Sequence, residues 1–127
     1  MNLTVAAVFA AHGLIYVPRM FVLKAQTERP EGMDNANPRA QQAKLEGRGA
    51  RALAAHNNAF EDFAPFAAAA LFARYSGAYT NGKDLIDGLA IAHVALRVVY
   101  TGLYLGNIPT ARTAVWILAQ LTTGALF

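Results

Sequence analysis

Three polar residues that could do chemistry lie in a stretch otherwise rich in alanine, from about residue 48 to residue 75. On a helix of about 100° per residue, Arg51, Asn58 and Glu61 share an arc of roughly 140° with Arg48 and Asp62. An arginine holds a carboxylate through paired hydrogen bonds, and a glutamate holds an ammonium group. Ionisable groups deep in a bilayer are costly unless they pair or line a wet cavity, which makes them candidates for a functional site.

A second polar stripe follows on a later apolar stretch, where His93, Arg97, Tyr100 and Tyr104 are spaced by four, three and four residues. These residues fall within about 60° on a helix, so we expect them to face the earlier helix across a polar slot. A simpler alternative is that Arg97 and Glu61 only neutralise each other as a buried pair.

Positive groups outnumber negative ones around this predicted slot. They are Arg48, Arg51, Arg97 and Arg112, against Glu61 and Asp62. A surplus of guanidinium groups suits an anionic ligand, and a remaining carboxylate suits an ammonium group on the same ligand. A zwitterionic peptide with a net negative charge fits this pattern.

The elements that must position these residues are four apolar stretches in a chain of 127 residues. We predict membrane-spanning helices at about residues 3–24, 48–75, 84–105 and 110–127. No stretch alternates with period two, which favours helix over strand. A soluble bundle would need broad polar outer faces, whereas residues 5–11 and 114–119 are apolar all round. We therefore predict an all-α integral membrane four-helix bundle, as a single domain over residues 1–127.

Basic residues cluster in and beside the first predicted loop, at residues 24–51, and Arg112 follows the third loop. The positive-inside rule puts loops one and three in the cytoplasm and both chain ends outside. These flanks account for the net charge of +3, so we expect no nucleic-acid partner. Asp84 is expected to cap the third helix after a loop over residues 76–83. Short loops and no targeting extension lead us to expect a bacterial inner membrane.

Cysteine is absent from the chain, which excludes thiolate zinc sites and cysteine nucleophiles. The three histidines are His12, His56 and His93, and no two of them have the spacing of four that would support a metal site on one helix. We expect no metal. His56 lies about 160° from Asn58 on the helical wheel, so we expect it to be a packing or interfacial residue.

The residues match a family pattern. The elements of that pattern are Arg51, Asn58-x-x-Glu61, Arg97-x-x-Tyr100-x-x-x-Tyr104 and Arg112-Thr113. Together with the chain length, the four spans and the polar first loop, they resemble a bacterial-type member of the MAPEG family, the membrane-associated proteins of eicosanoid and glutathione metabolism. The resemblance covers nearly the whole chain.

The resemblance implies a homotrimer that binds glutathione between neighbouring subunits near the cytoplasmic side. In relatives, the residues that match Asn58, Glu61, Tyr100 and Tyr104 contact the tripeptide, and Glu61 would hold the γ-glutamyl ammonium group. Arg112 would lie near the sulfur and activate the thiol as the catalytic residue, because a nearby cation lowers a thiol pKa. We assign the remaining matched residues, Arg51, Arg97 and Thr113, to the same cofactor site.

The chain departs from the eicosanoid synthases at two positions, because Ala54 and Asn57 stand where those enzymes, or some of them, have arginine. Our leading prediction is a glutathione-dependent transferase or peroxidase that takes hydrophobic electrophiles from the lipid. The alternative is a non-catalytic protein that binds a lipid or another small molecule, which the missing arginines favour. A transporter or channel fits less well, since the charges cluster at one side of the predicted membrane.

Overall fold

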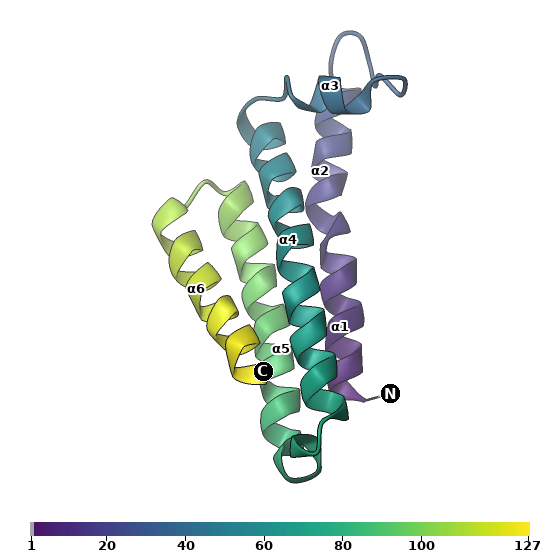
Figure 1. The fold of residues 1–127 in the computed structure, drawn as a ribbon. Helices are drawn as coiled ribbons and strands as arrows, with labels where there is room; N and C mark the ends of the chain where they lie inside the picture. Colours follow the sequence, from purple (N-terminus) through teal and green to yellow (C-terminus); the bar gives the residue numbers. More distant parts are fainter. Residues whose placement is uncertain (1) are drawn as a thin grey trace.

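The first long helix of the molecule is bent in its middle. The computed structural model describes residues 2–127, and in it α1 (Leu3–Leu14) and α2 (Tyr16–Thr27) meet at Ile15 (Figure 1). Pro18 lies just after the bend and has no N–H to donate four residues back, so a break in the hydrogen-bond ladder is expected here. At its start, α1 is capped by the Asn2 side chain, which accepts the Thr4 N–H at 3.0 Å.

The next two long helices, α4 (Gly47–Tyr75) and α5 (Ala78–Leu105), form an antiparallel pair joined by a very short turn. The structure places the start of α5 before the predicted cap at Asp84, although the backbone leaves helical φ and ψ at Gly82, inside the predicted loop. The helix begins at Ala78 and continues through a bend at Gly82, so Asp84 is an exposed residue inside it. Tyr79 holds the extra turn in place because its hydroxyl lies 3.2 Å from Oδ1 of Asp87.

A tight loop joins α5 to α6 (Pro109–Leu126), as the sequence predicts. Asn107 adopts a left-handed conformation with φ of 59°, which asparagine tolerates better than most residues. The Ile108 N–H then donates to the Leu103 carbonyl at 3.0 Å and closes the end of α5. Pro109 starts α6 at a position where its missing N–H costs nothing.

The first loop is folded against the end of α2 through two buried glutamines. Gln41, on the short helix α3 (Pro38–Gln42), donates to the Gly32 carbonyl at 2.6 Å and accepts the Asp34 N–H at 3.1 Å. Gln26 at the end of α2 donates to the Gln41 side chain at 2.9 Å. The polar segment between α2 and α4 therefore has a defined shape.

The helices run side by side, with the bent α1–α2 helix along α4 and α5, and with α6 against α5 (Figure 1). Loops one and three lie at one end of the bundle, and the N-terminus and the α4–α5 turn lie at the other. Alanines dominate the buried core, where Ala69, Ala70 and Ala90 surround Phe66. Small residues allow close helix approach: a Cβ on Gly49 would lie 2.9 Å from the Cβ of Ala25.

Among residues 2–127, two helices are long and apolar enough to cross a membrane, Leu3–Thr27 and Ala78–Leu105. The chain is all-helical over these residues, with no strand. Large apolar side chains point outward from the bundle on α1, α5 and α6, which suits a lipid environment. Examples are Phe9, Leu85, Val98, Ile117, Leu118 and Leu121.

Candidate functional site

A hollow of about 180 Å³ lies where α4, α5 and α6 meet. It brings together five residues of the predicted site. Its walls are Asn58 from α4, Tyr100 and Tyr104 from α5, and Arg112, Thr113 and Trp116 from α6. Trp116 is a wall residue that sequence reasoning missed. Tyr100 and Tyr104 are four residues apart, as are Arg112 and Trp116, so each pair lies on one face of its helix. Both members of each pair therefore line the same hollow.

Arg112 enters this hollow from the first turns of α6. Its backbone N–H donates to the Ile108 carbonyl at 3.1 Å, and its guanidinium carbon lies 4.2 Å from the centre of the Tyr104 ring. Tyr100 meets Tyr104 edge to face at 5.6 Å. Among residues 2–127, no carboxylate lies within ion-pair distance of Arg112. The positive end of the α6 dipole adds to this uncompensated charge, so the hollow favours an anion.

A second hollow of about 120 Å³ adjoins the first and shares Asn58 and Trp116 with it. The other residues around it are Glu61, Asp62, Pro65 and Gln120. Glu61 is exposed at the surface of α4. Pro65 has no N–H, so the carbonyl of Glu61, four residues earlier, lacks its usual helical donor. The second hollow is therefore richer in acceptors than the first.

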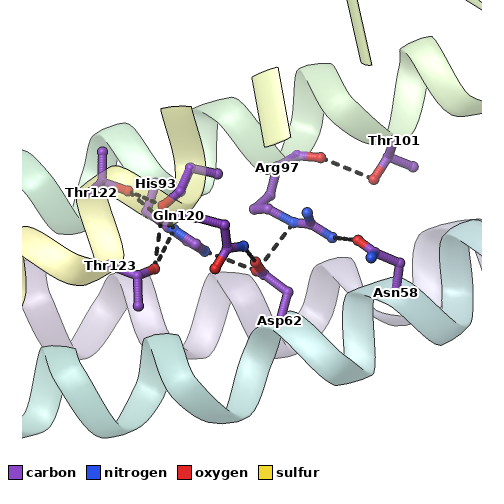
Figure 2. A network of polar contacts seen from close by, with 9 residues as sticks. Asn58, Asp62, His93, Arg97, Thr101, Gln120, Thr122 and Thr123 are labelled. Atoms are coloured by element: carbon purple, nitrogen blue, oxygen red, sulfur yellow. Dashed lines mark hydrogen bonds and ion pairs between the residues drawn. The ribbon is translucent and has the colours of Figure 1, made fainter. Parts of the chain in front are cut away.

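Asp62, in the wall of this second hollow, is the centre of a buried polar network (Figure 2). One carboxylate oxygen accepts from His93 Nε2 at 3.0 Å and lies 3.2 Å from Arg97 Nε. The other accepts from Gln120 Nε2 at 2.6 Å. Asp62 and Arg97 are 7% and 4% exposed, and His93 is fully buried. Such a carboxylate and guanidinium stabilise each other only while both are present.

His93 continues the network toward α6. Its Nδ1 lies 3.1 Å from the Ala119 carbonyl and 3.1 Å from the hydroxyl of Thr123. Its ring stacks on Phe66 at 3.9 Å with an angle of 5° between the planes. The imidazole is thus fixed by contacts on both nitrogens and on one face.

Arg97 links the network to the first hollow. Its Nη2 donates to the Asn58 side-chain oxygen at 2.9 Å, and its guanidinium carbon lies 4.3 Å from the Tyr100 ring centre. Within residues 2–127 its Nη1 is buried and has no hydrogen-bond partner. Arg97 itself lines neither of the two hollows. It stands behind Asn58.

The structure gives Arg97 a different partner from the simpler alternative, and it places Arg51 outside both hollows. We considered Arg97 and Glu61 as a buried pair, but the partner of Arg97 is Asp62, and Glu61 points elsewhere. One step along a helix rotates a side chain by about 100°, so the sequence left open which acid would face α5. Arg51 lies on the Asn58 face of α4 but lines neither hollow, and within residues 2–127 its Nε is buried without a partner.

A larger hollow of about 620 Å³ lies between α2, α3 and α4, and it contains none of the predicted site residues. Its walls include Arg19, Arg39, His56 and Asn57. His56 Nδ1 lies 2.8 Å from the Ile15 carbonyl at the bend of the first helix. His56 therefore joins α4 to this bend.

The sequence analysis counted Asp62 among the charges of the predicted slot but missed Gln120, and both residues carried a signal. Asp62 fell within the polar arc of its helix, and Gln120 is a lone amide in an apolar stretch. A polar residue in the middle of an apolar helix is costly unless it finds a partner, and here each is the other's partner.

Comparisons with known proteins agree with the pattern of residues. No curated protein and no solved structure matches the chain, but the model of the MAPEG family matches residues 3–127. The match covers nearly the whole chain, and this family consists of membrane proteins that are in general associated with glutathione. The protein therefore belongs to the MAPEG family.

Proposed function

We propose that the protein is a membrane-embedded transferase or peroxidase that activates glutathione against hydrophobic electrophiles. One observation carries this proposal: Arg112 lies beside Tyr104 in the hollow between α4, α5 and α6, and within residues 2–127 it forms no ion pair with a carboxylate. An unpaired cation at a helix N-terminus stabilises a thiolate and lowers the thiol pKa from about 8.5. Arg112 is the residue we assign to thiolate stabilisation.

The two adjoining hollows suit opposite ends of the zwitterionic tripeptide. The first hollow supplies donors from Arg112, from the hydroxyls of Tyr100 and Tyr104, and from the Asn58 amide, which suit carboxylates and the thiolate. The second supplies the Glu61 carboxylate, which suits the γ-glutamyl ammonium group. The shared walls at Asn58 and Trp116 make one ligand across both hollows geometrically reasonable.

The chemistry follows from a stabilised thiolate. In a transfer, the sulfur donates an electron pair to an electrophilic carbon, a C–S bond forms, and the leaving group departs with its bonding electrons. In peroxide reduction, one thiolate attacks the terminal peroxide oxygen, the O–O bond breaks, and the alkoxide leaves and takes up a proton to give the alcohol. The sulfur of a second glutathione then attacks the resulting sulfenic acid, so that the S–O bond breaks, the disulfide forms and water leaves. Holding the two reactants together supplies much of the acceleration.

The hydrophobic substrate would reach the site from the lipid. Trp116 lines both hollows and is 40% exposed, and the next two residues, Ile117 and Leu118, are also exposed. An apolar molecule dissolved in the bilayer would therefore meet the site at the exposed part of Trp116.

We further propose that α4 and α6 cross the membrane together with the two more apolar helices. Loops one and three would then lie in the cytoplasm of a bacterial inner membrane, and three copies would assemble as the family resemblance implies. Glutathione would bind near the cytoplasmic side, because the first hollow lies close to loop three, where α6 begins.

Calorimetry with glutathione on the detergent-purified protein tests the binding step. We expect saturable binding that Glu61→Gln weakens, since the substitution removes the charge opposite the ammonium group. The absence of a saturable heat change when glutathione is added to folded wild-type protein would refute the proposal.

Arg112 is tested by titrating the thiol of bound glutathione and by measuring turnover with a hydrophobic electrophile. Removing one preorganised group that stabilises developing charge typically costs about 100-fold in rate, and we expect this loss for Arg112→Ala. Arg112→Lys should recover part of the rate, because it keeps the charge but loses the planar guanidinium. An unchanged thiolate fraction in Arg112→Ala would remove the residue from this role.

A non-catalytic lipid-binding protein is the second candidate. It is favoured by Ala54 and Asn57, which replace cations of the eicosanoid synthases, and by Arg51, which lines neither hollow. A lipid that co-purifies with the protein, together with no glutathione binding, would favour this alternative.

A further inference from the structure

We propose that Asp62 is a positioning residue that acts through Arg97 to fix the amide of Asn58, so that the site requires an acceptor oxygen on its ligand at that point. This inference rests on the proposed function and deepens it. Asp62 is separate from the matched family pattern, and it lines the second hollow but not the first.

The orientation of the Asn58 amide follows from the chemistry of its neighbour. A guanidinium has only donors, so the Asn58 atom that lies 2.9 Å from Arg97 Nη2 is the oxygen. The NH₂ group therefore points away from Arg97. Asn58 lines both hollows and Arg97 lines neither, so the free donor is the part of this amide that a ligand meets.

Arg97 can hold the amide only because it is itself held. Asp62 lies 3.2 Å from Arg97 Nε, while His93 and Gln120 donate to the same carboxylate and fix its plane (Figure 2). Three helices contribute to this arrangement. His93 on α5 and Gln120 on α6 thus donate to Asp62 on α4. Asp62 in turn holds Arg97 on α5, and Arg97 donates to Asn58 on α4.

This polarity selects a ligand group. A carboxylate or carbonyl oxygen would accept the Asn58 NH₂ hydrogen bond, whereas an ammonium or hydroxyl hydrogen directed at it would meet another donor. A site built to hydrogen-bond a polar group discriminates strongly against ligands that lack it. We therefore expect the carboxylate or peptide carbonyl oxygens of the tripeptide to lie opposite Asn58.

Asp62→Asn breaks this network of hydrogen bonds and ion pairs while keeping the size of the side chain. The amide cannot neutralise Arg97 and cannot accept from all three donors, so Arg97 loses its fixed orientation. We expect the glutathione dissociation constant to rise at least tenfold, and KM for glutathione to rise more than kcat falls. Asp87→Asn is the matched control: it makes the same change at the other buried aspartate, and we expect its glutathione affinity to stay within twofold of wild type.

The double variant Asn58→Asp with Asp62→Asn separates positioning from simple stability. The new carboxylate at position 58 is close enough to pair with Arg97, so the thermal stability lost in Asp62→Asn should return, but the donor to the ligand is gone. We expect this variant to be stable and still weak in binding. Recovery of both stability and binding would overturn the proposal, as would wild-type affinity in Asp62→Asn.

A readout without ligand keeps this test apart from the proposed function. In protein labelled with ¹⁵N-asparagine, Asn58→Asp identifies the Asn58 side-chain NH₂ signals by their loss. Because the two NH₂ protons of any asparagine are inequivalent, the readout is their chemical shift and line width: wild type should show sharp signals, and Asp62→Asn should shift or broaden them. Signals that are unchanged in Asp62→Asn would overturn the positioning role even if glutathione binds, whereas a wild type that fails to bind glutathione but shows the fixed amide would refute only the function.

Discussion

Two buried aspartates, Asp62 and Asp87, serve the protein differently although each accepts several hydrogen bonds and faces a cation. Asp87 lies near the start of α5 and accepts from the backbone and the hydroxyl of Thr4, from Tyr79 and from Lys83 at 2.8 Å. Lys83 is a neighbour on the same helix, and its side chain is 55% exposed. The cation of Asp62, by contrast, is the buried Arg97 on another helix.

This difference shows that a buried carboxylate indicates a ligand-binding site only when its hydrogen-bond partners lead to a pocket. Asp87 on α5 binds the first turn of α1 through the Thr4 backbone N–H. The free N–H groups at the start of α1 favour a negative charge there. Its network ends at solvent. The network of Asp62 ends at Asn58, a wall residue of the hollow that contains Arg112. One aspartate fastens helix ends, and the other supports a pocket.

Among substitutions that distinguish Asp62 from Asp87, Asp62→Ala should have the largest effect on the free energy of unfolding. The substitution leaves Arg97 buried without its counter-charge, and breaking a buried ion pair in this way costs about 3–5 kcal/mol. The free energy of unfolding, measured by denaturant titration in detergent, should fall by this amount. Truncating His93 or Gln120 in the same background should add little, since their shared acceptor is already gone.

A smaller effect is expected from Gly49→Ala, which touches neither aspartate. The added Cβ would lie 2.9 Å from the Ala25 Cβ across the α2–α4 contact, and overpacking of this kind costs about 1–3 kcal/mol. Thermal unfolding in detergent measures the loss. Glutathione affinity should be retained, so this variant shows how much stability can be lost without damage to the pocket; a parallel loss of binding would mean that stability alone controls the site.

Asp87→Asn should cost less again. The amide keeps one oxygen acceptor for Thr4 but loses the charge, and a hydrogen bond to a charged group contributes about 1.5–3 kcal/mol. We expect a loss at or below the lower end of that range, with faster amide hydrogen exchange confined to the first turn of α1. Equal acceleration across α4 would contradict the local role that we give to Asp87.

The smallest effect should come from Lys83→Ala. The ammonium group lies 2.8 Å from Asp87 but is largely solvated, and exposed ion pairs contribute little. We expect no measurable change in thermal unfolding and no change in glutathione binding. A loss as large as that of Asp87→Asn would show that the lysine, and not Thr4, provides the main partner of this carboxylate.

Much of the site could be predicted from the sequence because its residues lie on regular helices. The spacing of Tyr100 and Tyr104, and the position of Arg112 just after Pro109, put these side chains on defined faces, and the structure brings them to one hollow with Asn58. Their binding and catalytic roles stay predictions. The start of α5 differs from the prediction because Asn81, Gly82 and Lys83 read as a turn: Gly82 does leave helical φ and ψ, but the helix already begins before it, at Ala78.

The sequence by itself determined the family, the helical class and the faces on which the polar residues lie, because helical periodicity is a local property. Only the tertiary structure decided which acid on α4 faces Arg97. Glu61 and Asp62 are adjacent, and both fall within the polar arc, so the choice depends on the rotation of α4 against α5 and α6. That rotation is set by packing of small residues along all three helices, which brings His93, Gln120 and Arg97 to one carboxylate.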